Sequence, residues 1–175
     1  MKAYKFPEYD TPVHVGEKVC IVGGGNVAMD AARSSKRLGA DVTIVYRRSF
    51  DQMPARIEES NHAKEEGINF LNLHNPVEIH GQDGWVKDVK LEKMDLGKPD
   101  KSGRARPIPT GEYETIEFDS VIVSIGQSPN PLIKQTNPEI ETEPWGGIII
   151  NEDTTMTTKD GVFAGGDAVS GAATV

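Results

Sequence analysis

A glycine-rich turn is the first feature of the sequence whose residue types and spacing could do chemistry. Gly23, Gly25 and Ala28 lie in the pattern G-x-G-x-x-[G/A], between a short apolar run and a helix-like segment. The first glycine allows a tight turn, the second lets the backbone approach a pyrophosphate, and the alanine lets the helix pack closely on the strand. The helix start, which includes Asn26 and Val27, offers unpaired N–H groups to phosphate oxygens. The turn predicts a dinucleotide-binding site.

Two arginines predict which dinucleotide is bound. A site for NAD usually carries Asp or Glu at the end of the second strand, about 20 residues past the glycines, where it binds the ribose 2′-hydroxyl. Tyr46, Arg47 and Arg48 occupy that place here. Guanidinium groups suit a 2′-phosphate because their charge and planar shape favour bidentate contacts. Residues 31–57 also hold six basic residues against two acidic ones. We therefore predict NADPH; the alternative is a solvated pair of surface arginines.

A second candidate site lies near the C-terminus, at Gly166 and Asp167. They follow an apolar segment over residues 158–165 that we expect to be a strand. A carboxylate at this place can accept a hydrogen bond from a sugar-like hydroxyl, and a following helix can direct its N-terminus at a phosphate. A Gly-Gly-Asp turn is common, so by itself this motif leaves a binding site and an ordinary turn equally open.

The alternation of apolar runs and amphipathic segments predicts an α/β fold. Short connections between strands and helices are typical of a central parallel sheet with right-handed crossovers. Alternating residues between about 76 and 120 predict an antiparallel β-meander with one wet face. Residues 95–112 are rich in Gly, Pro, Lys and Arg, and we expect an exposed loop there. The expected strands cover residues 19–22, 42–46, 68–73 and 121–125, and the expected helices cover residues 26–38 and 56–66.

Several of these motifs together resemble a known family. The segment ending at Asp167 is similar to the second flavin-binding motif of two-dinucleotide-fold flavoproteins, T-x-x-x-[GV]-[VI]-[FY]-A-x-G-D. Residues 121–130, with Gly126, are similar to the signature at which such chains leave the NAD(P) domain. The set resembles the small (beta) subunit of NADPH-dependent glutamate synthase and its relatives, among them the large subunit of NADH-dependent ferredoxin:NADP oxidoreductase and the flavin region of dihydropyrimidine dehydrogenase. The matching segments are residues 23–30, 46–48, 53–55 and 165–168.

The resemblance implies a fold, cofactors and partners. The fold is a Rossmann-like FAD/NAD(P)-binding domain whose parallel sheet carries helices on one side and the antiparallel meander on the other. The parent protein passes hydride from NADPH to FAD and electrons on to iron–sulfur clusters outside this chain. Its partners are NADP(H), the FAD domain, and a glutamate synthase large subunit or a ferredoxin-type protein. The implied cofactor-binding residues are Gly23, Gly25, Asn26, Val27, Ala28, Arg47, Arg48, Gly126, Gly166 and Asp167.

The same resemblance predicts how the chain is organised. Residues 1–17 are expected to be a linker from a flavin domain, and residues 18–128 the NADPH-binding domain. Residues 129–175 are expected to return toward the FAD domain. The family's first flavin fingerprint and iron–sulfur region are absent, and the chain ends at Val175 within an apolar run. We therefore expect an excised fragment that binds NADP(H) weakly and catalyses nothing alone.

Composition excludes several classes of function. The net charge of −8 disfavours nucleic acid and anionic membranes, and no apolar run spans a bilayer. Without a secretory signal, a cytoplasmic location is the default expectation. Cys20 is the single cysteine, so the C-x-x-C pair of thioredoxin reductases is excluded. The four histidines lack ligand-like spacing, so no metal site is expected. Hydride transfer needs no acid or base, so no catalytic residue is expected either.

Two rival functions stay open. One is a non-catalytic NAD(P)-sensing Rossmann module, which would carry no flavin motif. The other is a complete small dehydrogenase, which would need a catalytic pair such as Tyr-x-x-x-Lys, and none of the four tyrosines has a lysine four residues on.

Overall fold

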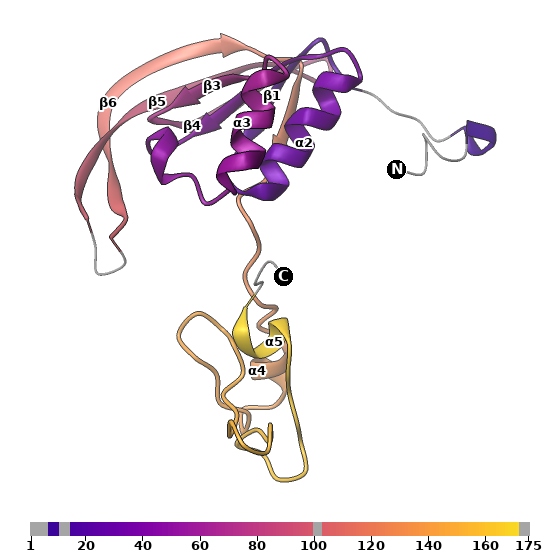
Figure 1. The fold of residues 1–175 in the computed structure, drawn as a ribbon, viewed down its shortest axis with the longest axis vertical. Coiled ribbons are helices and arrows are strands. Elements are labelled where there is room, and N and C mark those ends of the chain that lie inside the picture. The colour runs from indigo at the N-terminus through magenta and orange to yellow at the C-terminus, as the bar shows by residue number, and fades with distance from the viewer. Residues whose placement is uncertain (1–6, 11–14, 100–102, 172–175) are drawn as a thin grey trace. The chain divides into compact units, whose positions relative to one another are not determined.

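The computed structural model describes residues 7–10, 15–99 and 103–171. The chain forms two compact units that divide between Ile125 and Gly126 (Figure 1). The expected linker over residues 1–17 lies partly outside the described residues, and its described part includes the 3₁₀ helix η1 (Pro7–Tyr9). The expected break at the C-terminal end also lies outside them.

A four-stranded parallel sheet forms the centre of the first unit. Its order is β3-β2-β1-β7, so the first strand in sequence lies in the middle. Apolar residues of β1 pair with apolar neighbours on both sides, such as Ile21 with Ile44 on one side and Ile122 on the other. The strands are β1 (Lys18–Val22), β2 (Asp41–Tyr46), β3 (Asn69–Asn72) and β7 (Ser120–Val123).

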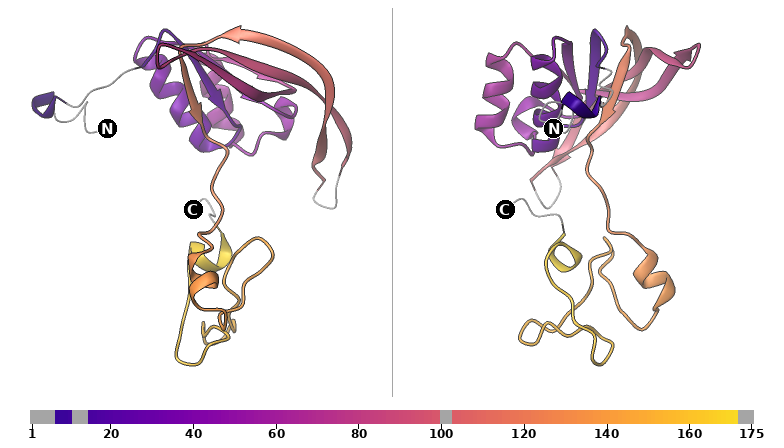
Figure 2. Two further views of the ribbon diagram at one scale, coloured as in Figure 1. Left: turned by 180° about the vertical axis from the view of Figure 1, so that it is seen from behind. Right: turned by 90° about the vertical axis from the view of Figure 1, so that its right-hand side faces the viewer.

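Two helices, α2 (Asn26–Arg37) and α3 (Ile57–Glu65), cover one face of this sheet (Figure 2). They form the crossovers from β1 to β2 and from β2 to β3. Ala28 and Ala32 are fully buried, and such small side chains let α2 approach the strands closely. The core on this side consists of Val19, Ile21, Ala28, Met29, Ala32, Ala40, Val42, Ile44, Ala63 and Ile68.

An antiparallel sheet covers the opposite face, as the right-hand view of Figure 2 shows. It consists of β4 (His74–Gln82), β5 (Trp85–Pro99) and β6 (Ala105–Glu117), in that order. Alternate residues of β1 point to opposite faces, so Cys20 joins the core on this side. That core consists of Cys20, Val45, Val89, Leu91 and Phe118. The expected fold, with helices on one side of the parallel sheet and a meander on the other, is confirmed.

The expectation of an exposed loop over residues 95–112 is wrong. Strand β5 continues to Pro99, and β6 already begins at Ala105. Residue pairs such as Leu96 with Pro107 extend the antiparallel ladder, with register shifts on the way. Prolines suggested a loop because they cannot donate a hydrogen bond, but β6 is an edge strand, where a missing N–H is tolerated.

The second unit contains little regular structure. Its helices are short, α4 (Leu132–Thr136) and α5 (Asp167–Ser170). The expected strand over residues 158–165 is wrong: Phe163 forms only an isolated bridge with Met156. Phe163 is 62% exposed, so its side chain does not join a buried layer that would favour a longer strand.

Within residues 7–10, 15–99 and 103–171, no helix has the length and hydrophobicity that crossing a bilayer requires.

Candidate functional site

The glycine turn between β1 and α2 has the tight geometry that its sequence predicts. Gly23 has φ +135°, a conformation that L side chains rarely adopt. A Cβ atom on Gly23 would lie 2.3 Å from the main-chain oxygen of Ser124, just after β7. The N–H of Gly23 donates to the oxygen of Val45 at 3.1 Å. The chain therefore turns between two neighbouring strands, in a space that excludes a side chain.

The next two glycines differ in what surrounds them. A Cβ atom on Gly24 would lie 2.8 Å from the ring of Tyr46, so this glycine lets the backbone pack on that ring. A Cβ atom on Gly25 would meet nothing closer than Cγ of Pro54, at 3.9 Å. Gly25 thus leaves open space at the start of α2, which is the space that a pyrophosphate needs.

The N-terminus of α2 lacks a side-chain cap. Its N-cap is Gly25, and no side chain there accepts a hydrogen bond from the first turn. Such N–H groups are the usual ligands of phosphate at a helix start. Val27 is 69% exposed at this end, whereas Ala28 is buried against the sheet. The buried Ala28 lets α2 lie close to the strands, while the Val27 side chain points away from them.

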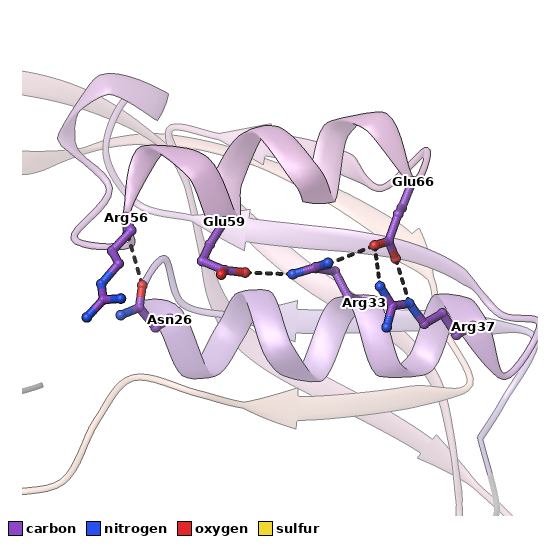
Figure 3. Close-up of polar contacts among 6 residues, drawn as sticks. All are labelled: Asn26, Arg33, Arg37, Arg56, Glu59 and Glu66. Atoms are coloured by element: carbon purple, nitrogen blue, oxygen red, sulfur yellow. Dashed lines mark hydrogen bonds and ion pairs between the residues drawn. The ribbon is translucent and has the colours of Figure 1, made fainter. Parts of the chain in front are cut away.

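Asn26 has a contact that the sequence did not indicate. Its Oδ1 accepts a hydrogen bond from the main-chain N–H of Arg56, at 2.9 Å (Figure 3). The N–H of Ala55 donates to the oxygen of Gly24 at 3.0 Å. These bonds join the glycine turn to the segment before α3, so Asn26 positions the turn through its side chain.

The two arginines after β2 are not equivalent. Arg47 is exposed. Arg48 is half-buried, and its Nε donates to the main-chain oxygen of Ala105 at 2.8 Å. Arg48 therefore ties β2 to the hairpin of β5 and β6, while Arg47 presents its guanidinium at the surface.

The positive charge counted over residues 31–57 is partly neutralised. Arg33 lies between Glu59 and Glu66, with N···O distances of 2.6 and 2.9 Å. Arg37 also pairs with Glu66, at 2.6 Å (Figure 3). The hydrogen bond from Arg37, together with Arg33, holds the pKa of Glu66 below its ordinary value. Both glutamates lie outside residues 31–57, so the count of charges over that range does not include them. The ion pairs join α2 to α3, and the two paired arginines add little positive charge to a phosphate site.

Tyr46 is a residue of the site that the sequence did not single out as a contact. Its ring packs against Gly24, and its hydroxyl donates to the main-chain oxygen of Gln52 at 2.9 Å. Nη2 of Arg104 lies 3.2 Å from the same hydroxyl. Residues 46 and 104 are far apart in the sequence, so no local pattern indicates this contact.

The remaining predicted residues belong to the second unit. Gly126 has φ +86°, with open space where its Cβ would be. Gly166 has φ +60° and precedes α5, and Asp167 is exposed at the first position of that helix. The glycine turn and the arginines lie in the first unit, so the predicted residues fall into two sets.

Histidines and acidic residues assemble no metal centre in the described part of the chain. His80 contacts Glu78 on its own strand, β4, and Asp88 on the neighbouring strand, β5. The hydrogen bond to Asp88 is the main reason why the pKa of His80 lies above its ordinary value.

Comparison with known proteins places this arrangement in a family. The model of the family described as pyridine nucleotide-disulphide oxidoreductase matches residues 2–175. The chain belongs to the pyridine nucleotide-disulphide oxidoreductase family. Within this family, it is 43% identical to the beta subunit of NADP(+)-dependent formate dehydrogenase from Moorella thermoacetica, over 91% of this chain and 23% of that protein. It is 38% identical to the small chain of NADPH glutamate synthase from Halomonas elongata, over 89% of this chain and 34% of that one. The resemblance to glutamate synthase small chains is confirmed, and the chain spans about a quarter to a third of these relatives.

Solved structures of other proteins share the fold. Thioredoxin reductase from T. acidophilum superposes with a TM-score of 0.70 and 25% identity, over 97% of this chain and 47% of that one. Mycobacterium tuberculosis FprA in complex with NADPH has a TM-score of 0.70 and 20% identity, over 92% of this chain and 49% of that one. The lone Cys20 differs from a redox-active thiol, because burial raises its pKa to about 12.

Proposed function

We propose that this chain is the NADPH-binding part of a flavin-dependent oxidoreductase similar to the glutamate synthase small chain. The observation that carries the proposal is the pairing of two features in one unit. The start of α2 is open and has no side-chain cap at Gly25, and Arg47 is exposed at the end of the neighbouring strand β2. The curated names of the two relatives above include NADP(+) or NADPH, which supports the same cofactor.

In this proposal, the residues of the first unit bind and orient the nucleotide. Gly23 makes the turn, and Gly25 and the following N–H groups of α2 bind the pyrophosphate. Arg47 contacts the 2′-phosphate directly. Arg48 holds the β5–β6 hairpin in place through the oxygen of Ala105, and the remaining N–H groups of its guanidinium can add to the phosphate site.

The cofactors would supply the redox chemistry, which is hydride transfer from NADPH to FAD. The protein's own task is to bind the nucleotide, to orient it and to exclude wrong nucleotides. We propose no catalytic residue, since hydride transfer requires no general acid or base from this chain. Asp167 is proposed to accept a hydrogen bond from a hydroxyl of FAD, and Gly126 and Gly166 to let the backbone approach that cofactor.

The domain organisation and the partners are inferred from the same relatives. Residues 18–128 would form the NADPH domain, and residues 129–175 would return to an FAD domain. Iron–sulfur clusters outside this chain would take the electrons onward, to a glutamate synthase large subunit or a ferredoxin-type partner. A cytoplasmic location is part of the same prediction.

Flavin reduction in the full-length protein tests the proposal. The protein is mixed anaerobically with NADPH or NADH, and the flavin absorbance is followed. We expect faster bleaching with NADPH. Absence of flavin from the purified protein, or NADPH binding without bleaching, would contradict the proposal and favour a nucleotide-sensing module.

A further inference from the structure

The loop after β2, which carries both arginines, is fastened at each end. We call residues 47–53 the arginine loop. Near its start, the N–H of Leu73, just after β3, donates to the main-chain oxygen of Arg48 at 3.2 Å. Near its end, the hydroxyl of Tyr46 donates to the main-chain oxygen of Gln52 at 2.9 Å. The loop therefore leaves β2 and returns to its last residue, and the two arginines lie within the closed part.

A phenylalanine anchors the middle of the arginine loop. Phe50 begins the 3₁₀ helix η2 (Phe50–Gln52), and its oxygen accepts a hydrogen bond from the N–H of Met53 at 3.0 Å. The Phe50 ring meets the ring of Phe70, on β3, edge to face, with the two centroids 5.2 Å apart. Phe70 in turn packs against the core on the helix side of the parallel sheet. Two aromatic rings therefore join the middle of the loop to the core.

A lysine of α3 contacts the same aromatic pair. Nζ of Lys64 lies 3.2 Å from the centroid of the Phe50 ring and 5.9 Å from that of Phe70. An ammonium group over an aromatic face is attracted by the negative charge of the π system. Lys64 thus connects the loop to α3, and the N–H of Ala55, just before α3, donates to the oxygen of Gly24 in the glycine turn. These contacts hold the loop, the helix and the turn together without using the side chain of either arginine.

We propose that Phe50, together with Lys64, is a positioning residue of the NADPH site, which fixes the loop that presents Arg47 to the 2′-phosphate. This inference rests on the proposed function. The Arg47 side chain is exposed, so the place of its guanidinium depends on the main chain of the loop. A main chain that is fixed before the nucleotide arrives loses less entropy when it binds. Phe50 acts through the loop and not by contact with the nucleotide.

The test measures the affinities of the full-length protein and of its Phe50→Ala variant for NADPH and for NADH. NADPH affinity should fall by about 3- to 10-fold, because the loop must then be ordered on binding. NADH affinity should stay within about 2-fold, because NADH has no 2′-phosphate. Hydrogen exchange of the amides at residues 47–53 should become faster. Phe50→Tyr keeps the ring and should keep the nucleotide preference of the wild type.

A second variant tests the contact with the lysine. Lys64→Met removes the ammonium group and keeps a long unbranched side chain, so NADPH affinity should fall by about 2- to 5-fold. The same change made in Phe50→Ala should have no further effect, because the ring is already absent. Lys87→Met is the matched control, since it removes a charge from an exposed position of β5. It should leave both affinities unchanged.

The outcomes separate the positioning role from the proposed function. A wild type that binds NADPH and NADH equally would contradict the proposed function itself. A wild type that prefers NADPH, with the same preference in Phe50→Ala, would overturn only the role of Phe50. Equal losses of NADPH and NADH affinity would overturn that role too, because they would mark a general effect on the fold. If Phe50→Ala does not fold, Lys64→Met decides, since Lys64 is exposed; an unchanged preference there would overturn the role of the pair.

Discussion

The guanidinium Nε of Arg48 donates a 2.8 Å hydrogen bond to the main-chain oxygen of Ala105, 57 residues later in the chain. This bond joins the end of the parallel strand β2 to the start of β6 in the antiparallel sheet. A residue predicted only to bind a phosphate therefore also fixes how the two sheets of the first unit meet. Arg47, its neighbour, has the exposed position that direct phosphate binding needs.

Arg48→Ala should loosen the hairpin. A hydrogen bond from a charged donor is worth about 1.5 to 3 kcal/mol, so the amides near Ala105 should exchange with solvent about 10-fold faster or more. Hydrogen exchange of the full-length protein, read by mass spectrometry, measures this locally. The matched Arg47→Ala change should leave the exchange at β6 unaltered. Equal exchange in both variants would refute the positioning role of Arg48.

Alanine substitutions in the glycine turn should separate folding from binding. Gly23→Ala combines a positive φ with a Cβ 2.3 Å from the Ser124 oxygen, and should cost about 2 kcal/mol of stability or more. Gly25→Ala has a permitted φ of −91° and its nearest atom at 3.9 Å, so its thermal unfolding should stay near that of the wild type.

Gly25→Ala should weaken nucleotide binding, although it leaves thermal unfolding nearly unchanged. The added methyl group fills the space proposed for the pyrophosphate, and NADPH affinity should fall by about 10-fold or more. Titration of NADPH against the folded variant measures this. Unchanged affinity would show that the pyrophosphate binds elsewhere.

Cys20 should be inert in the folded protein. It is fully buried, and desolvation raises its pKa to about 12, so almost no thiolate forms near neutral pH. Treatment with iodoacetamide, followed by peptide mapping, should find Cys20 unmodified in the native state and fully modified in denaturant. Rapid native modification would show that the core around β1 opens more often than its packing implies.

The ion pairs between α2 and α3 should make stability depend on pH. The pKa of Glu66 is lowered in the folded state, mainly by its hydrogen bond from Arg37. The contribution of ionised Glu66 to the free energy of unfolding is therefore complete when the pH is above the ordinary glutamate pKa of roughly 4.3. The contribution is lost as the pH falls below that value and through the lowered pKa. Glu66→Gln should lower the unfolding temperature near neutral pH and flatten the acid-side decline. A decline as steep as that of the wild type would contradict the assignment.

Local sequence patterns predicted most of the first unit, because each of its elements carries its own signal. The signals are local: small residues lie on one side of α2, a glycine follows each helix, and the strands are short apolar runs. Each of these patterns can be recognised within a few residues. The same reasoning failed for residues 95–112, where Pro107 and Pro109 suggested a loop. Whether a proline is tolerated depends on its strand being at a sheet edge, and that is a property of the whole sheet.

The candidate site shows the same division. Gly23, Gly25 and Ala28 could be predicted as site residues because the motif is defined by spacing alone. The contacts of Arg48 with Ala105 and of Arg104 with Tyr46 join residues more than 50 positions apart, and no local pattern encodes them. The count of positive charge around α2 was misleading for a related reason, since Glu59 and Glu66 lie just beyond the counted residues.

The most direct test of the central claim is the ratio of NADPH to NADH affinity in the full-length protein and in its Arg47→Ala variant. We expect a clear preference for NADPH in the wild type. In Arg47→Ala that preference should fall by about 10- to 100-fold through weaker NADPH binding alone. Equal affinities in the wild type, or an unchanged preference in the variant, would contradict the claim that this edge of the sheet binds the 2′-phosphate.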